Sequence, residues 1–332
     1  MRQLTIEEYR NRFYDLSHPE KTVMLYEIGP EDCCLPRRRP VSHKYSYGRA
    51  VIIGGCKGFS GAPWLAANAC ERSGAGLSCV MVPESIYPIV AMRCDGAVVM
   101  PLPSTKEGAV SSEALKETLS TLKNAASCAF GPGLGQSEAA AELLAGVLQE
   151  AECPLVLDAD ALSICGKHME WLKDSKAPVI LTPHEGEFKR LGGDLSRGRL
   201  IGALAFTERY PNVILVLKGY GTLVCSGREI AVNPTGSPAM AKGGSGDVLC
   251  GTLCALLAQG FNPLFSARTA VYLHGLAGDL ACRELGEYSL TPSDMIRYLP
   301  AAFRTVTMPG PKEFTVESNP QLSSGTPESA KL

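Results

Sequence analysis

Residues 233–260 read NPTGSPAMAKGGSGDVLCGTLCALLAQG, and this stretch decides the fold. Its first half, 233–246, is small and glycine-rich, whereas 248–258 is apolar enough to form a buried helix. Between them lies GGSGD, 243–247. Glycines let backbone N–H groups approach a ligand closely, and a helix that begins there adds unpaired N–H donors and the positive end of its dipole. The junction therefore predicts an anion site suited to phosphate.

Asp247 is a carboxylate placed at this junction, where it would repel a phosphate unless it had chemistry of its own. Taking a proton from a hydroxyl group is such a chemistry, which makes Asp247 a candidate general base. The alternative is that Asp247 only caps the helix, because aspartate is a favoured cap residue. Local sequence alone leaves both interpretations open.

The bulk composition limits the class of protein. The chain has 332 residues, 45% of them hydrophobic, and a formal net charge of −2. This length suits one large α/β domain or two small ones, and the near-neutral charge argues against nucleic-acid binding. No apolar run approaches the roughly 20 residues that cross a bilayer, and the charged N-terminus lacks a secretory signal. Thirteen cysteines, mostly in apolar surroundings and without a CxxC pair, favour reduced thiols in a cytoplasmic protein and argue against a zinc site.

Apolar strands alternate with helical stretches along the chain, which is typical of βαβ units in a parallel sheet. We expect strands at 47–55, 77–83, 127–130, 154–158, 179–183 and 213–218, and helices from Gly61 or Ala62 and at 113–122, 139–148 and 266–285. Ligands bind such sheets beyond the carboxyl ends of the strands. Polar or glycine-rich clusters follow these strands at 54–62, 131–135, Asp158 and Asp160, His184 and Glu187, and 218–222.

Composition also suggests boundaries. Residues 1–40 are polar and contain several prolines, and we expect them to be a lead-in. We expect 41–305 to form the ordered domain. Residues 306–332 are rich in Pro, Ser and Gly and are expected to be a disordered tail. The arginine run at 37–39 is either a phosphate contact or solvated charge.

Seven motifs occur in order: LPRRRPVSHKYSYGRAVIIGG, GFSGAPWLAANACERSGAGL, FGPGLG, LVLDADAL, ILTPHEGEFKRL, VLKGYGT and GGSGD. Together they resemble the ADP/ATP-dependent NAD(P)H-hydrate dehydratases over about residues 35–300. The resemblance implies a ribokinase-like fold, with three α/β/α layers around a mostly parallel sheet. Many bacterial relatives carry an epimerase domain in front, and the short lead-in is expected to make this chain a stand-alone dehydratase.

The resemblance also implies an activity. Family members restore NADH or NADPH from the S epimer of the hydrated forms, NADHX and NADPHX, using ADP in most bacterial members and ATP in eukaryotic ones. The ring hydroxyl is phosphorylated and phosphate is then eliminated, so that ADP yields AMP and phosphate. Mg²⁺ is expected to bridge the nucleotide phosphates. A homotetramer is implied by the resemblance only, and the choices of ADP or ATP and of NADHX or NADPHX stay open.

Site residues follow from the matched motifs. Asp247 is expected to be the catalytic base and to contact the substrate. The dinucleotide is expected at Ala62, Gly133 and His184. No residue is assigned as a metal ligand. The nucleotide is expected at Lys218, Gly219, Tyr220, Gly221, Thr222, Gly244, Ser245 and Gly246.

Several of these residues have structural alternatives. The 218–222 segment would equally suit a surface turn, with its glycines serving the backbone geometry. His184 is either a ligand contact or structural, and Glu187 supports it or caps its helix. Asp158 and Asp160 orient the site or help to hold hydrated Mg²⁺, unless Asp158 caps the next helix.

Four further residues received interpretations of their own. His274 is interpreted as a packing residue, and Arg197 and Arg199 as solvated charge. Trp64 stands where relatives have small aliphatic residues and would narrow the dinucleotide pocket.

Two other functions compete. One is a small-molecule kinase of the same fold acting on hydroxyethylthiazole, hydroxymethylpyrimidine or a sugar, which would use the same Asp247 and glycines. The other is a nucleotide-sensing module without catalysis. The combination of GPGLG, DADAL and TPHEGEF favours the dehydratase, and the intact GGSGD argues against the sensor.

Overall fold

The structure is a computed structural model that describes residues 1–15 and 23–308. The described strands are β1 Arg2–Gln3, β2 Met24–Glu27, β3 Arg49–Ile53, β4 Leu77–Pro83, β5 Val98–Leu102, β6 Ser127–Phe130, β7 Leu155–Leu157, β8 Val179–Leu181, β9 Val213–Leu217, β10 Leu223–Ser226 and β11 Glu229–Val232. The described helices are α1 Ile6–Phe13, α2 Gly61–Arg72, α3 Tyr87–Ala91, α4 Ala114–Leu122, α5 Glu138–Glu150, α6 Asp160–Cys165, α7 Trp171–Asp174, α8 Glu185–Arg190, α9 Arg199–Arg209, α10 Ser245–Ala258, α11 Pro263–Leu285 and α12 Pro292–Val306.

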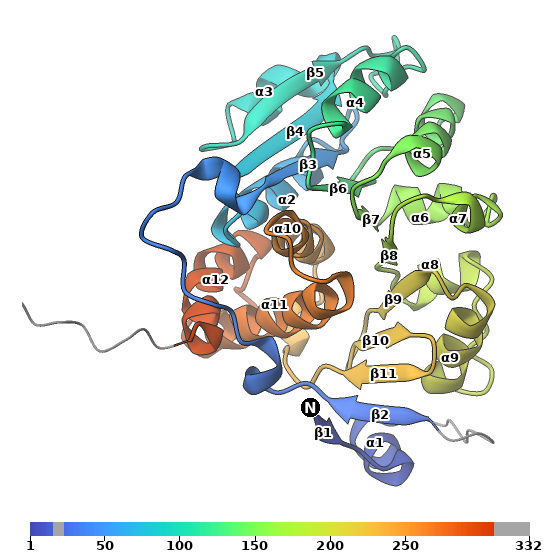
Figure 1. The fold of residues 1–332 in the computed structure, drawn as a ribbon, viewed down its shortest axis with the longest axis vertical. Coiled ribbons are helices and arrows are strands. Elements are labelled where there is room, and N and C mark those ends of the chain that lie inside the picture. The colour runs from blue at the N-terminus through green and yellow to red at the C-terminus, as the bar shows by residue number, and fades with distance from the viewer. Residues whose placement is uncertain (16–22, 309–332) are drawn as a thin grey trace, which may run out of the picture.

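All of these strands join one sheet in the order β1-β2-β11-β10-β9-β8-β7-β6-β3-β4-β5 (Figure 1). The strands from β9 across to β5 are parallel to their neighbours, and the antiparallel pairs β9–β10, β10–β11 and β1–β2 lie toward the other end. In register, Ile53 pairs with Phe130, Phe130 with Leu157, and Leu157 with Leu181. The carboxyl ends of β3, β6, β7 and β8 therefore lie side by side, so the loops that follow them meet at one edge.

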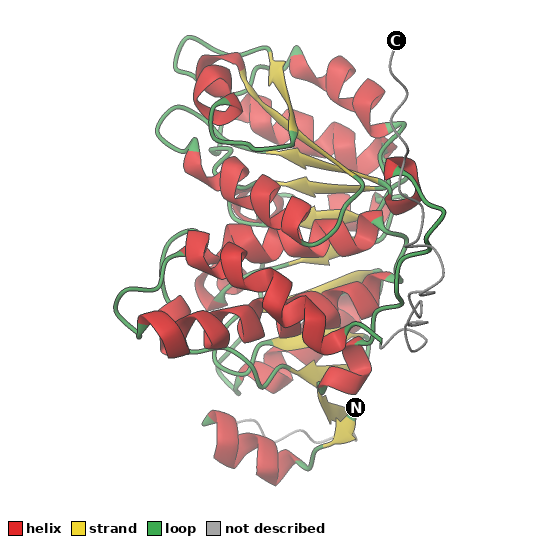
Figure 2. Ribbon diagram, turned by 90° about the vertical axis from the view of Figure 1, so that its left-hand side faces the viewer, coloured by secondary structure: helices red, strands yellow, loops and turns green. Residues whose placement is uncertain are grey.

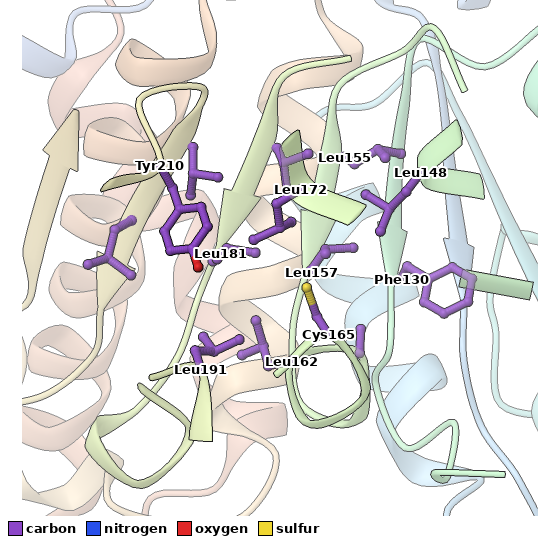
Figure 3. Packing of buried hydrophobic residues seen from close by; sticks show 14 of the residues in the cluster. Phe130, Leu148, Leu155, Leu157, Leu162, Cys165, Leu172, Leu181, Leu191 and Tyr210 are labelled. Carbon is purple, nitrogen blue, oxygen red and sulfur yellow. The ribbon is translucent and has the colours of Figure 1, made fainter. Parts of the chain in front are cut away.

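Side chains alternate between the two faces of the sheet, which produces two cores. On β3, Val51 and Ile53 join the core beneath α4, α5, α6 and α9, whereas Ala50 and Ile52 join the core beneath α2, α10, α11 and α12. Figure 3 shows part of the first core, where Leu155, Leu157 and Leu181 of the sheet pack with helix residues such as Leu162. Helices thus cover both faces (Figures 1 and 2), and the predicted three-layer α/β/α ribokinase-like architecture is confirmed.

Helix α10 is buried over most of its circumference because it lies between the sheet and the other helices of its layer. Gly251 permits its closest approach to α2, since a Cβ there would lie 2.0 Å from the carbonyl oxygen of Ala66. This packing fixes the start of α10 next to the loops at the carboxyl edge of the sheet.

The predicted strands are present within one or two residues of the expected bounds. The helix expected at 266–285 begins earlier, at Pro263, because Asn262 caps it through bonds to the backbone nitrogens of Leu264 and Phe265. After it, residues 292–306 form a 15-residue helix, α12, that begins with a Thr291 capping box. Among the described helices, none combines the length and the apolar character that a bilayer crossing requires.

The N-terminal segment is more structured than the lead-in that composition suggests. Strand β2 pairs in parallel with β11, and β1 pairs with β2, so these two short strands extend the sheet. At the other boundary, Val306 ends α12 and Thr307 bridges to Leu35, so the predicted disordered tail, 306–332, begins with ordered residues. Its remainder, 309–332, lies outside the described residues. The division of the chain into lead-in, domain and tail otherwise stays a prediction.

All three arginines at 37–39 are exposed, which agrees with the solvated alternative, and Arg38 in addition has defined partners. Arg38 donates to the carbonyl oxygen of Gly74 and to Oε1 of Gln259, and its guanidinium lies 3.8 Å from the ring centroid of Tyr47. Gly74 and Gln259 follow the C-terminal ends of α2 and α10, at the edge of the sheet away from the site. Arg38 therefore ties two helix ends together.

Candidate active site

The glycine-rich loops after β3, β6 and β7 pack directly on one another. A Cβ on Gly54 would lie 2.4 Å from the carbonyl oxygen of Pro132, and one on Gly131 would lie 2.0 Å from that of Asp158. Gly133 has a φ of +63°, and a Cβ there would lie 3.1 Å from Cβ of Ala62. The structure thus brings together Ala62 and Gly133, two of the residues predicted to bind the dinucleotide.

The first turn of α10 faces this group of loops. Gly244 is the cap residue, with a left-handed φ of +97°, and Ser245, Gly246 and Asp247 form the first turn. The backbone N–H of Ser245 donates to the carbonyl oxygen of Lys242 at 3.3 Å, whereas those of Gly246 and Asp247 have no acceptor within the helix. The hydroxyl of Ser245 is buried and has no hydrogen-bond partner among the described residues. Because Gly244 occupies the cap position, Asp247 does not cap the helix, and its carboxylate stays open to chemistry.

His274 of α11 forms a hydrogen bond to this first turn. Its Nε2 donates to the carbonyl oxygen of Ser245 at 2.9 Å. Burial lowers the pKa of His274 to about 4, so the ring is neutral near pH 7. The preceding loop is tied to the same helix by Asn233 and Thr235, which donate to the carbonyl oxygens of Val271 and Tyr272. His274, interpreted from sequence as a packing residue, therefore also fixes the backbone of the candidate phosphate site through this hydrogen bond.

A buried ion pair lies beneath the same turn. Asp158, which is 1% exposed, accepts hydrogen bonds from Nζ of Lys218 at 2.8 Å and from the hydroxyl of Thr182 at 2.7 Å. Lys218 also lies 3.7 Å from Oε2 of Glu187. A Cβ on Gly246 would lie 3.3 Å from Nζ of Lys218 and 3.6 Å from Oδ2 of Asp158. The alternative that Asp158 caps α6 is wrong, since its carboxylate is committed to Lys218 and Thr182.

The electrostatics of this cluster suit proton transfer near neutral pH. Burial, together with the Asp158 carboxylate, raises the pKa of Asp247 to about 7, although the Lys218 ammonium opposes both effects. Burial by itself would lower the pKa of Lys218, but Asp158 and Glu187 outweigh it, so the pKa of Lys218 is raised. Lys218 is therefore cationic at neutral pH, while Asp247 is divided between its two protonation states. A base whose pKa lies near the working pH is the favourable case for general-base catalysis.

His184 caps α8 and also presents a free face. Its Nδ1 accepts from the backbone nitrogens of Gly186 and Glu187 at 3.0 and 3.3 Å, and its own backbone nitrogen donates to Oε2 of Glu187 at 2.8 Å. This capping box places the proton on Nε2. Nε2 lies 3.6 Å from Oε1 of Glu187, but the side chain is 56% exposed, so Nε2–H is accessible to a ligand. Both interpretations of His184 are thus compatible with the structure, and Glu187 both supports His184 and caps the helix.

The 218–222 loop joins β9 to β10 at the same edge. Within it, the hydroxyl of Thr222 donates to the carbonyl oxygen of Gly219 at 3.0 Å. Arg199, interpreted from sequence as solvated charge, donates to the carbonyl oxygens of Leu217 at 3.0 Å and Tyr220 at 2.6 Å. That interpretation is wrong: Arg199 is a structural support of the loop.

Asp160 and Trp64 also have defined partners. Asp160 accepts from the backbone nitrogen of Gly135 at 2.9 Å and from Nε2 of Gln136 at 3.1 Å, so it orients the GPGLG loop. Trp64 donates through Nε1 to the carbonyl oxygen of Arg93, whose guanidinium lies 4.1 Å from the Trp64 ring centroid. The Trp64 ring is thus held against the segment that follows α3.

The described residues contain no cluster of three or more His, Cys, Asp or Glu side chains that would hold a metal ion. Mg²⁺ in nucleotide-dependent enzymes commonly keeps several waters and binds largely through the substrate phosphates. An open glycine turn next to carboxylates fits a Mg²⁺ ion that arrives with the nucleotide.

The fold and this carboxyl-edge site define an α/β enzyme of the ribokinase-like class. The sequence profile of the NAD(P)H-hydrate dehydratase family matches residues 50–301, and the chain belongs to that family. It is 38% identical over 276 residues to a bifunctional NAD(P)H-hydrate repair enzyme, Nnr, of Moorella thermoacetica, covering 82% of this chain and 52% of that protein. The Thermofilum pendens enzyme of the same name is 36% identical, with 82% and 53% covered. The chain therefore spans about half the length of these curated relatives.

Two solved structures show the same fold. The ADP/ATP-dependent NAD(P)H-hydrate dehydratase of Bacillus subtilis, co-crystallised with ATP and Mg²⁺, is 29% identical with a TM-score of 0.73, covering 85% of this chain and 98% of that one. A ribokinase-like superfamily protein of Enterococcus faecalis is 26% identical with a TM-score of 0.75, covering 88% and 100%.

Proposed function

We propose that this chain dehydrates the S epimer of hydrated NADH or NADPH, with ADP or ATP as the phosphoryl donor. The observation that carries the proposal is the position of Asp247, in the first turn of α10 with its pKa raised to about 7, next to the open glycine junction. Family membership supports the same reaction. A base, a phosphate site and a strand-end pocket are what this reaction requires.

Asp247 removes the proton from the ring hydroxyl of the hydrate, and the resulting oxygen attacks the terminal phosphoryl group of the nucleotide. The backbone N–H groups of Gly244, Ser245 and Gly246 and the ammonium of Lys218 stabilise the phosphoryl charge. Loss of a ring proton and of the phosphate then restores the double bond, so ADP leaves AMP and phosphate. A Mg²⁺ ion that arrives with the nucleotide would be held chiefly by the phosphates at the glycine junction and would neutralise part of their charge.

The remaining site residues fall into two groups. The nucleotide lies along Lys218, Gly219, Tyr220, Gly221 and Thr222, with Gly246 at its phosphates. The dinucleotide lies against Ala62, Gly133 and His184, where Nε2–H of His184 donates to a polar group. A homotetramer and a cytoplasmic location stay part of the proposal.

The direct experiment measures recovery of the reduced-nicotinamide absorbance from purified (S)-NADHX and (S)-NADPHX with ADP, with ATP and without nucleotide. We expect recovery only with a nucleotide, together with stoichiometric phosphate. A stable phosphorylated alcohol from a sugar or vitamin precursor, without turnover of the hydrates, would instead establish the kinase. Nucleotide binding without turnover of either would establish the sensor.

The pH profile tests the state of Asp247. Since the base acts in its deprotonated form, kcat/KM should fall about tenfold per pH unit below about pH 7, the value to which burial raises this pKa, and level off above it. The profile of kcat/KM against pH checks this, because it reports groups of the free enzyme. An acid limb near the ordinary aspartate value of about 4 would contradict the assignment.

A further inference from the structure

The 218–222 loop rests on side chains from two other parts of the chain. Gly219 has a φ of +150°, and a Cβ there would lie 2.8 Å from NH2 of Arg199. Gly221 has a φ of +65°, and a Cβ there would lie 2.3 Å from Cδ1 of Phe13. The Arg199 and Phe13 side chains that lie against the loop thus require glycine at both positions, independently of any ligand.

Arg199 fixes the loop through its main chain. Its guanidinium donates to the carbonyl oxygens of Leu217 at 3.0 Å, Tyr220 at 2.6 Å and Gly221 at 3.4 Å. These acceptors span the loop from the end of β9 to the residue before Thr222. One rigid, planar group therefore determines the direction of several peptide units.

The N-terminal segment completes this support. Asp15, which is buried, accepts from the backbone nitrogen of Arg199 at 2.9 Å and from the hydroxyl of Tyr9 at 3.2 Å. Phe13 is packed between two aromatic neighbours, with ring centroids 5.4 Å from Tyr9 and 5.5 Å from Tyr220. Helix α1 is held to the sheet because Arg12 pairs with Glu27 of β2, and β2 pairs with β11 (Figure 1).

We propose that Phe13, Asp15 and Arg199 form a brace that keeps the 218–222 loop in the shape that binds nucleotide. These are positioning residues, since Phe13 and Arg199 contact the loop, Asp15 holds the backbone of Arg199, and none of them is placed at the reacting atoms. The inference rests on the proposed function only in taking this loop as the nucleotide site. It gives residues 1–15 a role in nucleotide affinity that composition did not predict.

The physical basis is the fraction of molecules whose loop is ready to bind. Without Phe13, Gly221 loses the ring beneath it and the loop gains alternative conformations. The apparent affinity then falls in proportion to the competent fraction. Once nucleotide is bound at saturation, the chemical step is unchanged. The brace thus predicts a change in nucleotide KM rather than in kcat.

The test is Phe13→Ala in the full chain. We expect the Kd for ADP, measured by calorimetry, and the KM for ADP to rise about tenfold, which corresponds to about one tenth of the loops being competent. The kcat at saturating ADP and the KM for the hydrated dinucleotide should stay within about twofold. Arg199→Lys, which keeps the charge but removes the planar fork, should shift the same two nucleotide constants.

Phe265→Ala is the control for loss of a phenyl ring elsewhere, because it removes one aromatic contact, with Phe261 at 5.5 Å, at the start of α11 away from the site. It should leave the Kd for ADP unchanged. Gly221→Ala adds a second check, since its methyl group collides with Phe13. In the Phe13→Ala background this substitution should weaken ADP binding less than it does in the parent chain.

The outcomes separate the brace from the proposed function. If the wild-type chain and Phe13→Ala bind ADP equally well, the brace is overturned but the proposed function is not. A fall in kcat with an unchanged nucleotide KM would also overturn it, because that is the result of a loss of folded enzyme. Wild-type chain that binds neither ADP nor ATP would overturn both.

Discussion

Asp247→Asn should lower kcat by about 10²–10⁴-fold, the contribution that a positioned general base makes. The amide keeps the size of the carboxylate but does not accept the proton of the ring hydroxyl. Binding of ADP should persist, because the glycine junction and the 218–222 loop are untouched and one negative charge near the phosphates is removed. Single-turnover kinetics with saturating ADP and NADHX measure the effect on the chemical step.

The stability of this variant is an internal control whose sign is fixed by the pKa of Asp247. Burial raises that pKa above its unfolded value of about 4, so the ionised carboxylate costs stability in the folded state as pH rises, and fully so above about pH 7. Asparagine carries no such charge. The free energy of unfolding of Asp247→Asn at pH 8 should therefore equal or exceed that of the parent. Full activity in a stable variant would remove Asp247 from the mechanism.

Lys218→Met should destabilise the fold by about 3 kcal/mol, because it leaves the Asp158 carboxylate buried without its cationic partner. Asp158 is 1% exposed, and once the Lys218 ammonium is lost only the Thr182 hydroxyl remains of the two hydrogen-bond donors described above. The ammonium also lowers the pKa of Asp247, so its loss should move the acid limb of kcat/KM to higher pH. Urea denaturation and the pH profile measure the two effects separately.

Lys176→Met is the matched control for this substitution. Lys176 pairs with Glu150 at 3.3 Å, but the two side chains are 56% and 50% exposed. Solvated pairs of this kind contribute about 0–1 kcal/mol. If Lys218→Met lowered the free energy of unfolding by no more than Lys176→Met does, the Asp158–Lys218 pair would not be a stabilising element of the site.

Local pattern was sufficient for the elements that hold the site. Continuous apolar runs marked β3, β7, β8 and β9 because strands buried on both faces need no alternation. The glycine junction marked the start of α10, and Asp247 stood out as a carboxylate where a phosphate site was expected. Strands β1 and β2, at one end of the sheet, were missed because they have only 2 and 4 residues, and both residues of β1 are polar and exposed.

The contacts that set the pKa values and the loop geometry of the site could not be predicted from any local sequence pattern. Asp158 and Lys218 are 60 residues apart, and Asp15 and Arg199 are 184 apart. Each of these side chains, read alone, resembles ordinary surface charge. No spacing along the chain signals that Arg199 turns its guanidinium toward the carbonyl oxygens of a loop.

Sequence patterns were enough to predict the fold class, and they nominated the glycine junction as the candidate phosphate site and Asp247 as the candidate base, because backbone geometry and residue chemistry act over a few neighbouring positions. Tertiary structure alone decided the protonation of Asp247, the partner of Asp158 and the support of the nucleotide loop. The reason is that burial and Coulomb interactions depend on distances through space, which are set only when the carboxyl ends of the strands meet at one edge of the sheet.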